Sequence, residues 1–106
     1  HAFVAAWLAL DRLRAAWAAV TAGYDAVLMP TAPGLPPVVA PLLADAALFA
    51  AENLRALRNT RVGNLMGGCA LTLPTGTPCV GLSLMGPPGA ERHLLRLGRA
   101  VERVLG

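Results

Sequence analysis

Two long uncharged runs constrain the fold most strongly. Residues 26–44 carry no charged side chain over 19 positions, and residues 62–90 carry none over 29. Either run is long enough to cross a bilayer as a helix. The first contains five prolines, however, and the second contains seven glycines and four prolines. These residues interrupt helices, and lipid leaves irregular backbone unsatisfied. The runs therefore predict buried strands and loops of an α/β protein, with no membrane segment.

The overall composition is too apolar for a small free-standing domain. The chain of 106 residues is 56% hydrophobic and 14% charged, whereas average chains carry about 25% charged residues. A domain of this size has much surface to cover. We therefore expect a piece of a larger protein, whose apolar faces pack on segments outside this sequence.

Hydrophobic spacing and breakers predict the order helix, strand, loop, helix, strand, strand, helix. Apolar residues at steps of three and four indicate the first helix, Asp45 can cap the next, and Gly67-Gly68 can stop a short helical turn that follows it. The predicted elements are a helix over 3–21, a buried strand over 24–30, a proline-rich loop over 31–41, helices over 46–57 and 60–66, a hairpin of strands 70–74 and 79–86, and a last helix after residue 89.

Charge and cysteine usage exclude several classes of protein. All nine basic residues are arginines, scattered over three helical segments, and the net charge is +3. This indicates solvated helix faces rather than a nucleic-acid surface. A hairpin turning at Gly76-Thr77 would place Cys69 opposite Leu84 and Cys79 opposite Pro74. The two cysteines would then be out of register, and free thiols in a cytoplasmic protein are the expectation.

The chain lacks the residues for catalysis of its own. It contains one serine, Ser83, in a strand, and one internal histidine, His93, on a helix, and their spacing matches no Ser-His pair. No cysteine, histidine or acid spacing fits a metal site, and no lysine follows the glycine-rich turns as in a phosphate loop. We expect no catalytic residue, no metal and no cofactor within these residues.

Four polar residues within or beside the uncharged runs are candidates for a substrate pocket. Thr31 directly follows the predicted buried strand, a common ligand position in α/β sheets. Asn59, Thr60 and Asn64 lie on or beside the short helix, with Thr60 and Asn64 on one side of it. They could bond a substrate or a catalytic loop. Alternatively, Thr60 caps the helix and Asn64 satisfies buried backbone.

Three segments, in order, resemble the amidase signature family. The segment "YDAVLMPTAPGLPP" is similar to its aspartate-strand-Pro-Thr-x-Pro motif. "RNTRVGNLMGGCALTLPTG" resembles its Asn-Leu-x-Gly-x-x-Ala-x-x-x-Pro motif, and "VGLSLMGPPGAERHLLRLGRAVE" resembles its closing strand, Gly-Pro turn and final helix. The likeness covers nearly the whole chain. Cys69 stands where many members have proline, and the link from Pro74 to Val80 is shorter than usual.

The resemblance implies an enzyme that hydrolyses an amide to an acid and ammonia or an amine. In this family a Ser nucleophile is activated through a cis-peptide Ser by a Lys, and this chain, with no lysine and one serine, cannot hold that set. Residues 1–106 are therefore expected to be the C-terminal portion of one amidase domain with a mixed, helix-covered sheet. The catalytic portion would precede His1, and the isolated piece would be inactive and aggregation-prone.

Two alternatives stay open at this point. The first is the glutaminase subunit of a tRNA-dependent amidotransferase, which shares these motifs. The second is a non-catalytic α/β module that binds a partner through its apolar surface. For the amidase, the expected partners are a small amide substrate and the rest of its own chain, without nucleic acid or membrane. Its oligomeric state is open, and a homodimer is among the options.

Overall fold

The computed structural model describes residues 1–105, so Gly106 of the expected unit lies outside the described residues. The chain forms five helices and three strands in the described range, and the predicted α/β class is confirmed. In chain order the elements are α1 (Ala2–Thr21), β1 (Val27–Pro30), α2 (Val39–Ala44), α3 (Ala46–Ala56), α4 (Thr60–Met66), β2 (Cys69–Pro74), β3 (Gly81–Gly86) and α5 (Glu91–Leu105).

Helix α2 corrects the prediction of an extended loop over residues 31–41. Residues 31–38 are irregular as expected, but Val39–Pro41 begin a helix. Pro41 is the third residue of that helix, within the first turn, where a backbone N–H has no intrahelical acceptor. A proline in this turn therefore costs no hydrogen bond. Its carbonyl accepts from the backbone N–H of Asp45 at 3.1 Å.

The three strands form an antiparallel sheet in the order β1-β3-β2. In the β2–β3 hairpin, Cys69 lies opposite Gly86 and Pro74 opposite Gly81. The predicted register, with Cys69 opposite Leu84, was wrong by two residues. The connection is longer than a tight turn, because β2 ends at Pro74 and β3 begins at Gly81. The Thr75 hydroxyl donates to the Val80 carbonyl across this connection at 3.0 Å. Both cysteines are nevertheless free thiols, as predicted.

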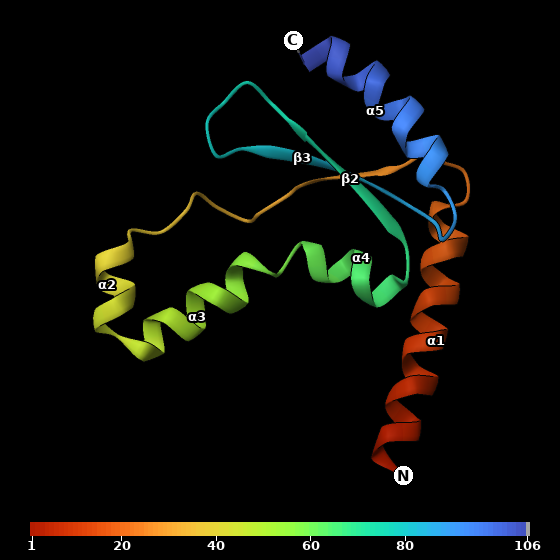
Figure 1. The fold of residues 1–106 in the computed structure, drawn as a ribbon. Helices are drawn as coiled ribbons and strands as arrows, with labels where there is room; N and C mark the ends of the chain where they lie inside the picture. Colours follow the sequence, from red (N-terminus) through yellow and green to blue (C-terminus); the bar gives the residue numbers. More distant parts are fainter. Residues whose placement is uncertain (106) are drawn as a thin grey trace.

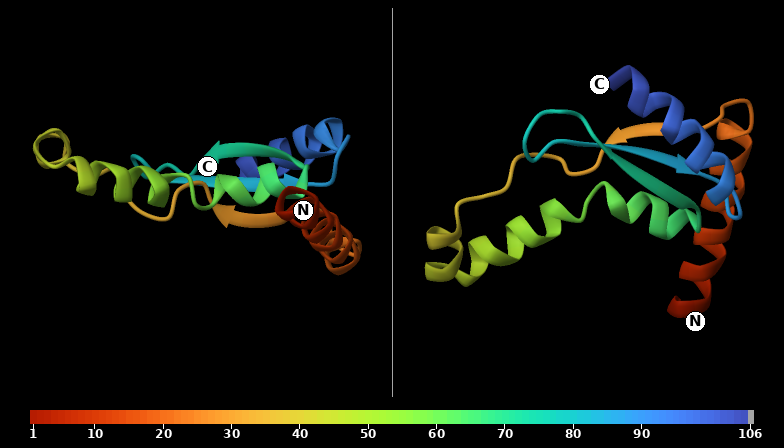
Figure 2. Two further views of the ribbon diagram at one scale, coloured as in Figure 1. Left: turned by 90° about the horizontal axis from the view of Figure 1, so that it is seen from below. Right: turned by 45° about the horizontal axis from the view of Figure 1, so that its top comes forward.

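Helix α5 covers one face of the sheet and forms the hydrophobic core with it (Figures 1 and 2). Leu84 on the central strand is fully buried, and Leu94 of α5 and Leu73 of β2 pack with it. Gly98 lets the helix approach closely, because a Cβ at this position would overlap the Leu71 side chain. The core is therefore small and lies between α5 and the hairpin.

Helices α4 and α1 lie on the other side of the sheet (Figure 2). Gly63 of α4 faces the Met85 side chain of β3, since a Cβ there would be 3.7 Å from the Met85 Cε. Arg14 of α1 donates from Nε to the Leu65 carbonyl at 2.8 Å. This contact gives a partner to a carbonyl in the last turn of α4 and places a positive charge at the negative end of that helix.

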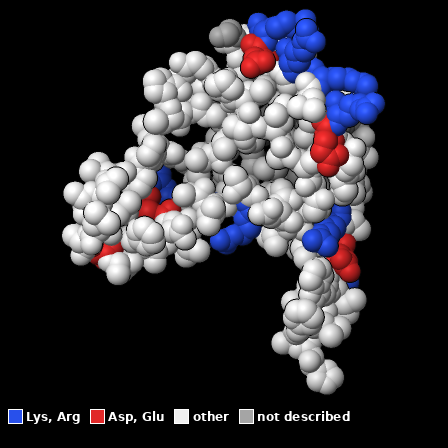
Figure 3. Space-filling model, in the orientation of Figure 1, with Lys and Arg blue, Asp and Glu red and all other residues white. Residues whose placement is uncertain are grey.

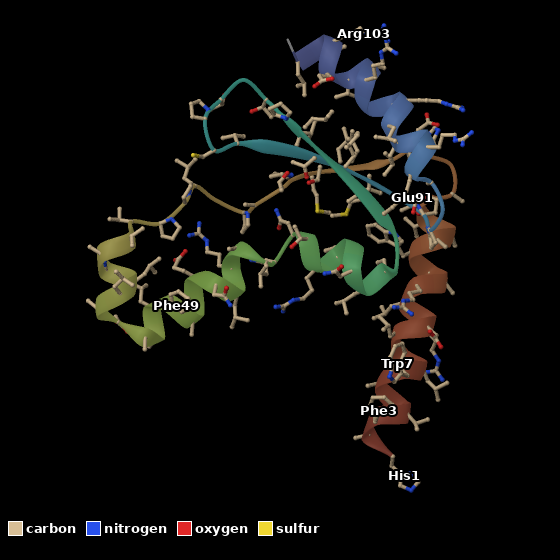
Figure 4. All side chains as sticks on the ribbon, viewed as in Figure 1. His1, Phe3, Trp7, Phe49, Glu91 and Arg103 are labelled. Carbon is tan, nitrogen blue, oxygen red and sulfur yellow. The ribbon has the colours of Figure 1, made fainter. Side chains whose placement is uncertain are left out.

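Much apolar surface remains uncovered. The molecule measures 50 × 45 × 18 Å. It exposes 7747 Å², against about 5,600 Å² expected for a folded monomer of its mass. The N-terminal part of α1 and the α2–α3 arm extend beyond the sheet, and Phe3, Trp7 and Phe49 lie on them, exposed (Figures 1 and 4). None of the helices in residues 1–105 combines the length and apolarity needed to cross a membrane.

Candidate functional site

Three hydroxyl side chains meet on the sheet face opposite α5. Thr72 of β2 lies directly opposite Ser83 of the central strand. Thr31 follows β1 and continues its pairing, with its backbone N–H donating to the Gly81 carbonyl at 2.9 Å. Because side chains alternate between faces along a strand, pairing brings all three to one face. We call Thr31, Thr72 and Ser83 the hydroxyl trio.

The trio is bonded through its buried member. The Ser83 Oγ lies 2.8 Å from the Thr31 Oγ1 and 3.0 Å from the Thr72 Oγ1, and only 3% of Ser83 is exposed. A hydroxyl has one proton to donate. If Ser83 donates to one threonine and accepts from the other, the threonine that accepts keeps its own proton. When Ser83 donates to Thr31, the Thr31 proton points to the Thr72 Oγ1. This Thr31–Thr72 hydrogen bond is long, at 3.5 Å, so a ligand in the hollow can replace it at little cost.

Gly81 makes room for both threonines. A Cβ at Gly81 would lie 2.9 Å from the Thr31 Oγ1 and 3.1 Å from the Thr72 Cγ2. Both separations are shorter than ordinary van der Waals contacts. The absence of a side chain at Gly81 therefore allows the two hydroxyl-bearing side chains to converge over the strand.

The trio lies at the edge of a hollow of about 750 Å³. Thr31 and Thr72 line it, together with the rest of residues 30–35, Pro74, and residues 76–81 of the hairpin connection. None of these lining residues is charged. Figure 3 shows the largest group of charged atoms over α5 and smaller groups on α1, α3 and α4, with white surface between them. This hydroxyl hollow suits a neutral group that accepts a hydrogen bond.

The four predicted pocket residues separate into two pairs. Thr31 lines the hollow, and the Asn59 side chain donates from Nδ2 to the Pro30 carbonyl at 2.8 Å, which fixes the residue before Thr31. Thr60 instead donates from Oγ1 to the Leu57 carbonyl at 3.2 Å, and Asn64 is exposed on α4. Their role toward a substrate stays a prediction. The structural alternatives are not found either. No side chain caps α4, so Thr60 is not its cap, and Asn64 is exposed and not among buried backbone groups.

Sequence reasoning missed Thr72 and treated Ser83 only as a strand hydroxyl. A signal for both exists in the segments "LTL" and "LSL", in which one polar residue lies between two leucines on each hairpin strand. Only the correct register places these two residues opposite each other. Ser83 contacts hydroxyls, whereas His93 of α5 pairs with Asp25, with 3.6 Å between Nε2 and Oδ1.

The site as described holds no metal-binding cluster. Within residues 1–105, no three His, Cys, Asp or Glu side chains gather as a metal ion would require. What the trio and the hollow can do is bind and orient a polar, uncharged group through a hydroxyl proton.

Replacing Ser83 with alanine should destabilise the protein and free both threonines. We expect the free energy of unfolding to fall by about 0.5–1.5 kcal/mol, because the hydrogen bonds of Ser83 are lost while Thr31 and Thr72 can still bond water. A double-mutant cycle with Thr72→Val, measured by urea denaturation, should show a coupling of at least about 0.5 kcal/mol. Strictly additive losses would contradict the bonded trio.

Comparisons with known proteins give one informative similarity. No protein-family model matches the chain, and no solved structure matches it. The chain is 40% identical over 101 residues to the 2-amino-5-chloromuconic acid deaminase of Comamonas testosteroni. The similarity covers 92% of this chain and 22% of the deaminase. The chain thus spans less than a quarter of the length of this relative.

Proposed function

We propose that residues 1–106 are the C-terminal portion of one catalytic domain in an amidase-type enzyme that hydrolyses a carbon–nitrogen bond. The observation that carries this proposal is the 40% identity to a deaminase over 92% of the chain. A deaminase releases ammonia by breaking the C–N bond of an amino group, and an amidase breaks the C–N bond of an amide, so both act on carbon–nitrogen bonds. The motif resemblance to amidases points to the same reaction class.

In this proposal the chain supplies a wall of the substrate pocket and part of the sheet core. The chemical step requires an activated nucleophile and a base. This chain has no lysine and a single serine, which is buried between two threonines. The Ser-cisSer-Lys set would therefore come from another part of the enzyme. It would form an acyl-enzyme from the amide, release ammonia or an amine, and then let water release the acid.

Thr31 is the proposed substrate contact with the strongest support. It lines the hydroxyl hollow, and its Oγ1 is held by Ser83 at 2.8 Å. Asn59 is proposed as a positioning residue, because its side chain bonds the Pro30 carbonyl and not the hollow itself. Thr60 and Asn64 remain proposed pocket residues only if another part of the enzyme brings substrate to α4.

The uncovered surface supports a place within a larger domain. The exposed area exceeds the value expected for a folded monomer by about 2,100 Å², and obligate interfaces are of this size. β1 and β2 are both edge strands of the described sheet, and an uncovered edge invites further pairing. A binding module that folds alone would bury more of its apolar side chains.

The test is ammonia release by the protein that contains these residues. We expect the full-length protein to release ammonia from carboxylic amides or from an amino acid such as 2-amino-5-chloromuconic acid. Purified residues 1–106 should release none and should self-associate in ultracentrifugation. Activity of the isolated piece would refute its assignment as a non-catalytic portion. Inactivity of the full-length protein on every C–N substrate would refute the function.

A further inference from the structure

A second hollow adjoins the hydroxyl hollow and differs from it in charge. It has a volume of about 290 Å³ and shares residues 32–35 and Cys79 with the first. Its remaining lining includes Glu52 and Arg55 of α3. Among the residues that line either hollow, these two alone are charged. A ligand that extends from the hydroxyl hollow along the 32–35 loop therefore meets the charged lining residues of residues 1–105 here.

The guanidinium of Arg55 lies directly against the loop that both hollows share. The nearest atom to a Cβ placed on Gly34 would be the Arg55 Nη2, which it would overlap. A side chain at Gly34 would thus displace the guanidinium. The bare backbone at Gly34 lets Arg55 reach the boundary between the two hollows.

Within residues 1–105, one edge of this guanidinium has no hydrogen-bond partner. The Arg55 Nη1 lies 3.3 Å from the Glu52 Oε2, and this is its only side-chain contact of that kind in the described part of the chain. The pair is partly exposed, with 52% of the Arg55 side chain and 25% of Glu52 accessible. A guanidinium carries five N–H donors in a planar fork that matches a carboxylate. The Nη2 packs against Gly34 and has no hydrogen-bond partner among residues 1–105, so its outward N–H can bind one.

We propose that Arg55 binds a carboxylate of the substrate and so selects acids that carry a free carboxylate beside the scissile C–N group. The neutral, hydrogen-bonding part of the substrate lies in the hydroxyl hollow, and its anionic end lies on Arg55. This inference rests on the proposed function and adds the class of substrate to it. In this proposal Glu52 holds the Arg55 guanidinium through Nη1. Its negative charge also repels the substrate carboxylate, so Glu52 weakens ligand binding.

The experiment measures binding of succinate, as a carboxylate probe, to the full-length protein by titration calorimetry. Arg55→Leu should weaken binding by about 10-fold or more, since charge-assisted bidentate bonds are lost. Arg55→Lys should recover part of that loss, because the charge remains without the fork. Glu52→Gln should tighten binding several-fold. Arg58→Leu is the matched control, because Arg58 lines a different hollow beside α1, and its Kd should not change.

Two results would overturn the assignment of Arg55. One is undetectable succinate binding by the wild-type protein. The other is equal binding by wild type and Arg55→Leu. The Glu52→Gln variant gives a further test. If Glu52 only holds Arg55 in place, this variant should weaken succinate binding. If Glu52 competes with the ligand for Arg55, as proposed, the variant should tighten binding.

A rate comparison separates this proposal from the proposed function. Succinamate and butyramide share the amide and differ in a carboxylate against a methyl group. We expect Arg55→Leu to raise the KM for succinamate about 10-fold and to leave butyramide unchanged. Hydrolysis of both amides with no effect of Arg55→Leu would overturn the role of Arg55 and retain the hydrolase. If neither amide nor 2-amino-5-chloromuconic acid released ammonia, while succinate binding stayed sensitive to Arg55→Leu, the hydrolase would be overturned and the carboxylate site retained.

Discussion

Replacing Leu84 with alanine is expected to lower the free energy of unfolding by about 2–5 kcal/mol. Leu84 lies on the central strand and is 0% exposed, and it packs against Leu73 and Leu94. The core around it contains few other buried side chains, so little can move into the cavity. Urea denaturation of the protein that contains these residues, followed by circular dichroism, measures the change.

Leu84→Met is the matched control at the same position. Methionine has a similar volume and an adaptable side chain, so its cost should stay below about 1.5 kcal/mol. If both variants lost the same stability, shape at this position would not matter. The assignment of the core between α5 and the hairpin would then be wrong.

Local signals explain why most elements could be predicted from the sequence. Asp45 was predicted to cap a helix, and its Oδ1 accepts from the backbone N–H groups of Ala47 and Leu48 at 2.9 and 3.0 Å. Gly67 was predicted to stop the short helix, and it adopts a left-handed φ of 68° at the end of α4. Both signals act within a few residues. These two signals can therefore be read from the sequence without knowledge of the tertiary fold.

Long-range pairing explains what could not be predicted. The hydroxyl trio depends on a hairpin register that is set by the length of the 75–80 connection, and the assumed tight turn shifted that register by two residues. The Arg14–Leu65 contact joins residues 51 positions apart. No local pattern encodes which carbonyl an arginine on a distant helix will reach.

In the candidate site, the sequence shows which residues are polar but does not show which groups their side chains bond. The sequence marked four polar residues within or beside the uncharged runs as pocket candidates. Asn59 and Thr60 are adjacent in sequence, yet one bonds the end of β1 and the other bonds its own preceding turn. The orientation is set where α3 ends and α4 begins, and that geometry depends on packing against the sheet.

Gly68→Ala is expected to have the second large effect on stability. Gly68 links α4 to β2, and a Cβ there would overlap the carbonyl oxygen of Gly86, which ends the neighbouring strand β3 at the same open end of the hairpin. A backbone oxygen cannot rotate away as a side chain can, so the strands or α4 must shift. We expect a loss of about 1–3 kcal/mol, near the upper end, in urea denaturation.

Gly63→Ala on the same helix provides the control and separates sterics from glycine replacement as such. Its Cβ would make ordinary contacts with Met85, at 3.7 Å and beyond, and alanine favours a helix interior by about 0.5–1 kcal/mol over glycine. Its stability should therefore be unchanged or higher.

A shift of α4 in Gly68→Ala would also pull Asn59 from the Pro30 carbonyl and release the backbone beside Thr31. The variant should then lose substrate affinity at temperatures where it is still folded. A stable Gly68→Ala protein with normal affinity would contradict both the close α4–β2 junction and the positioning of Thr31 through Asn59.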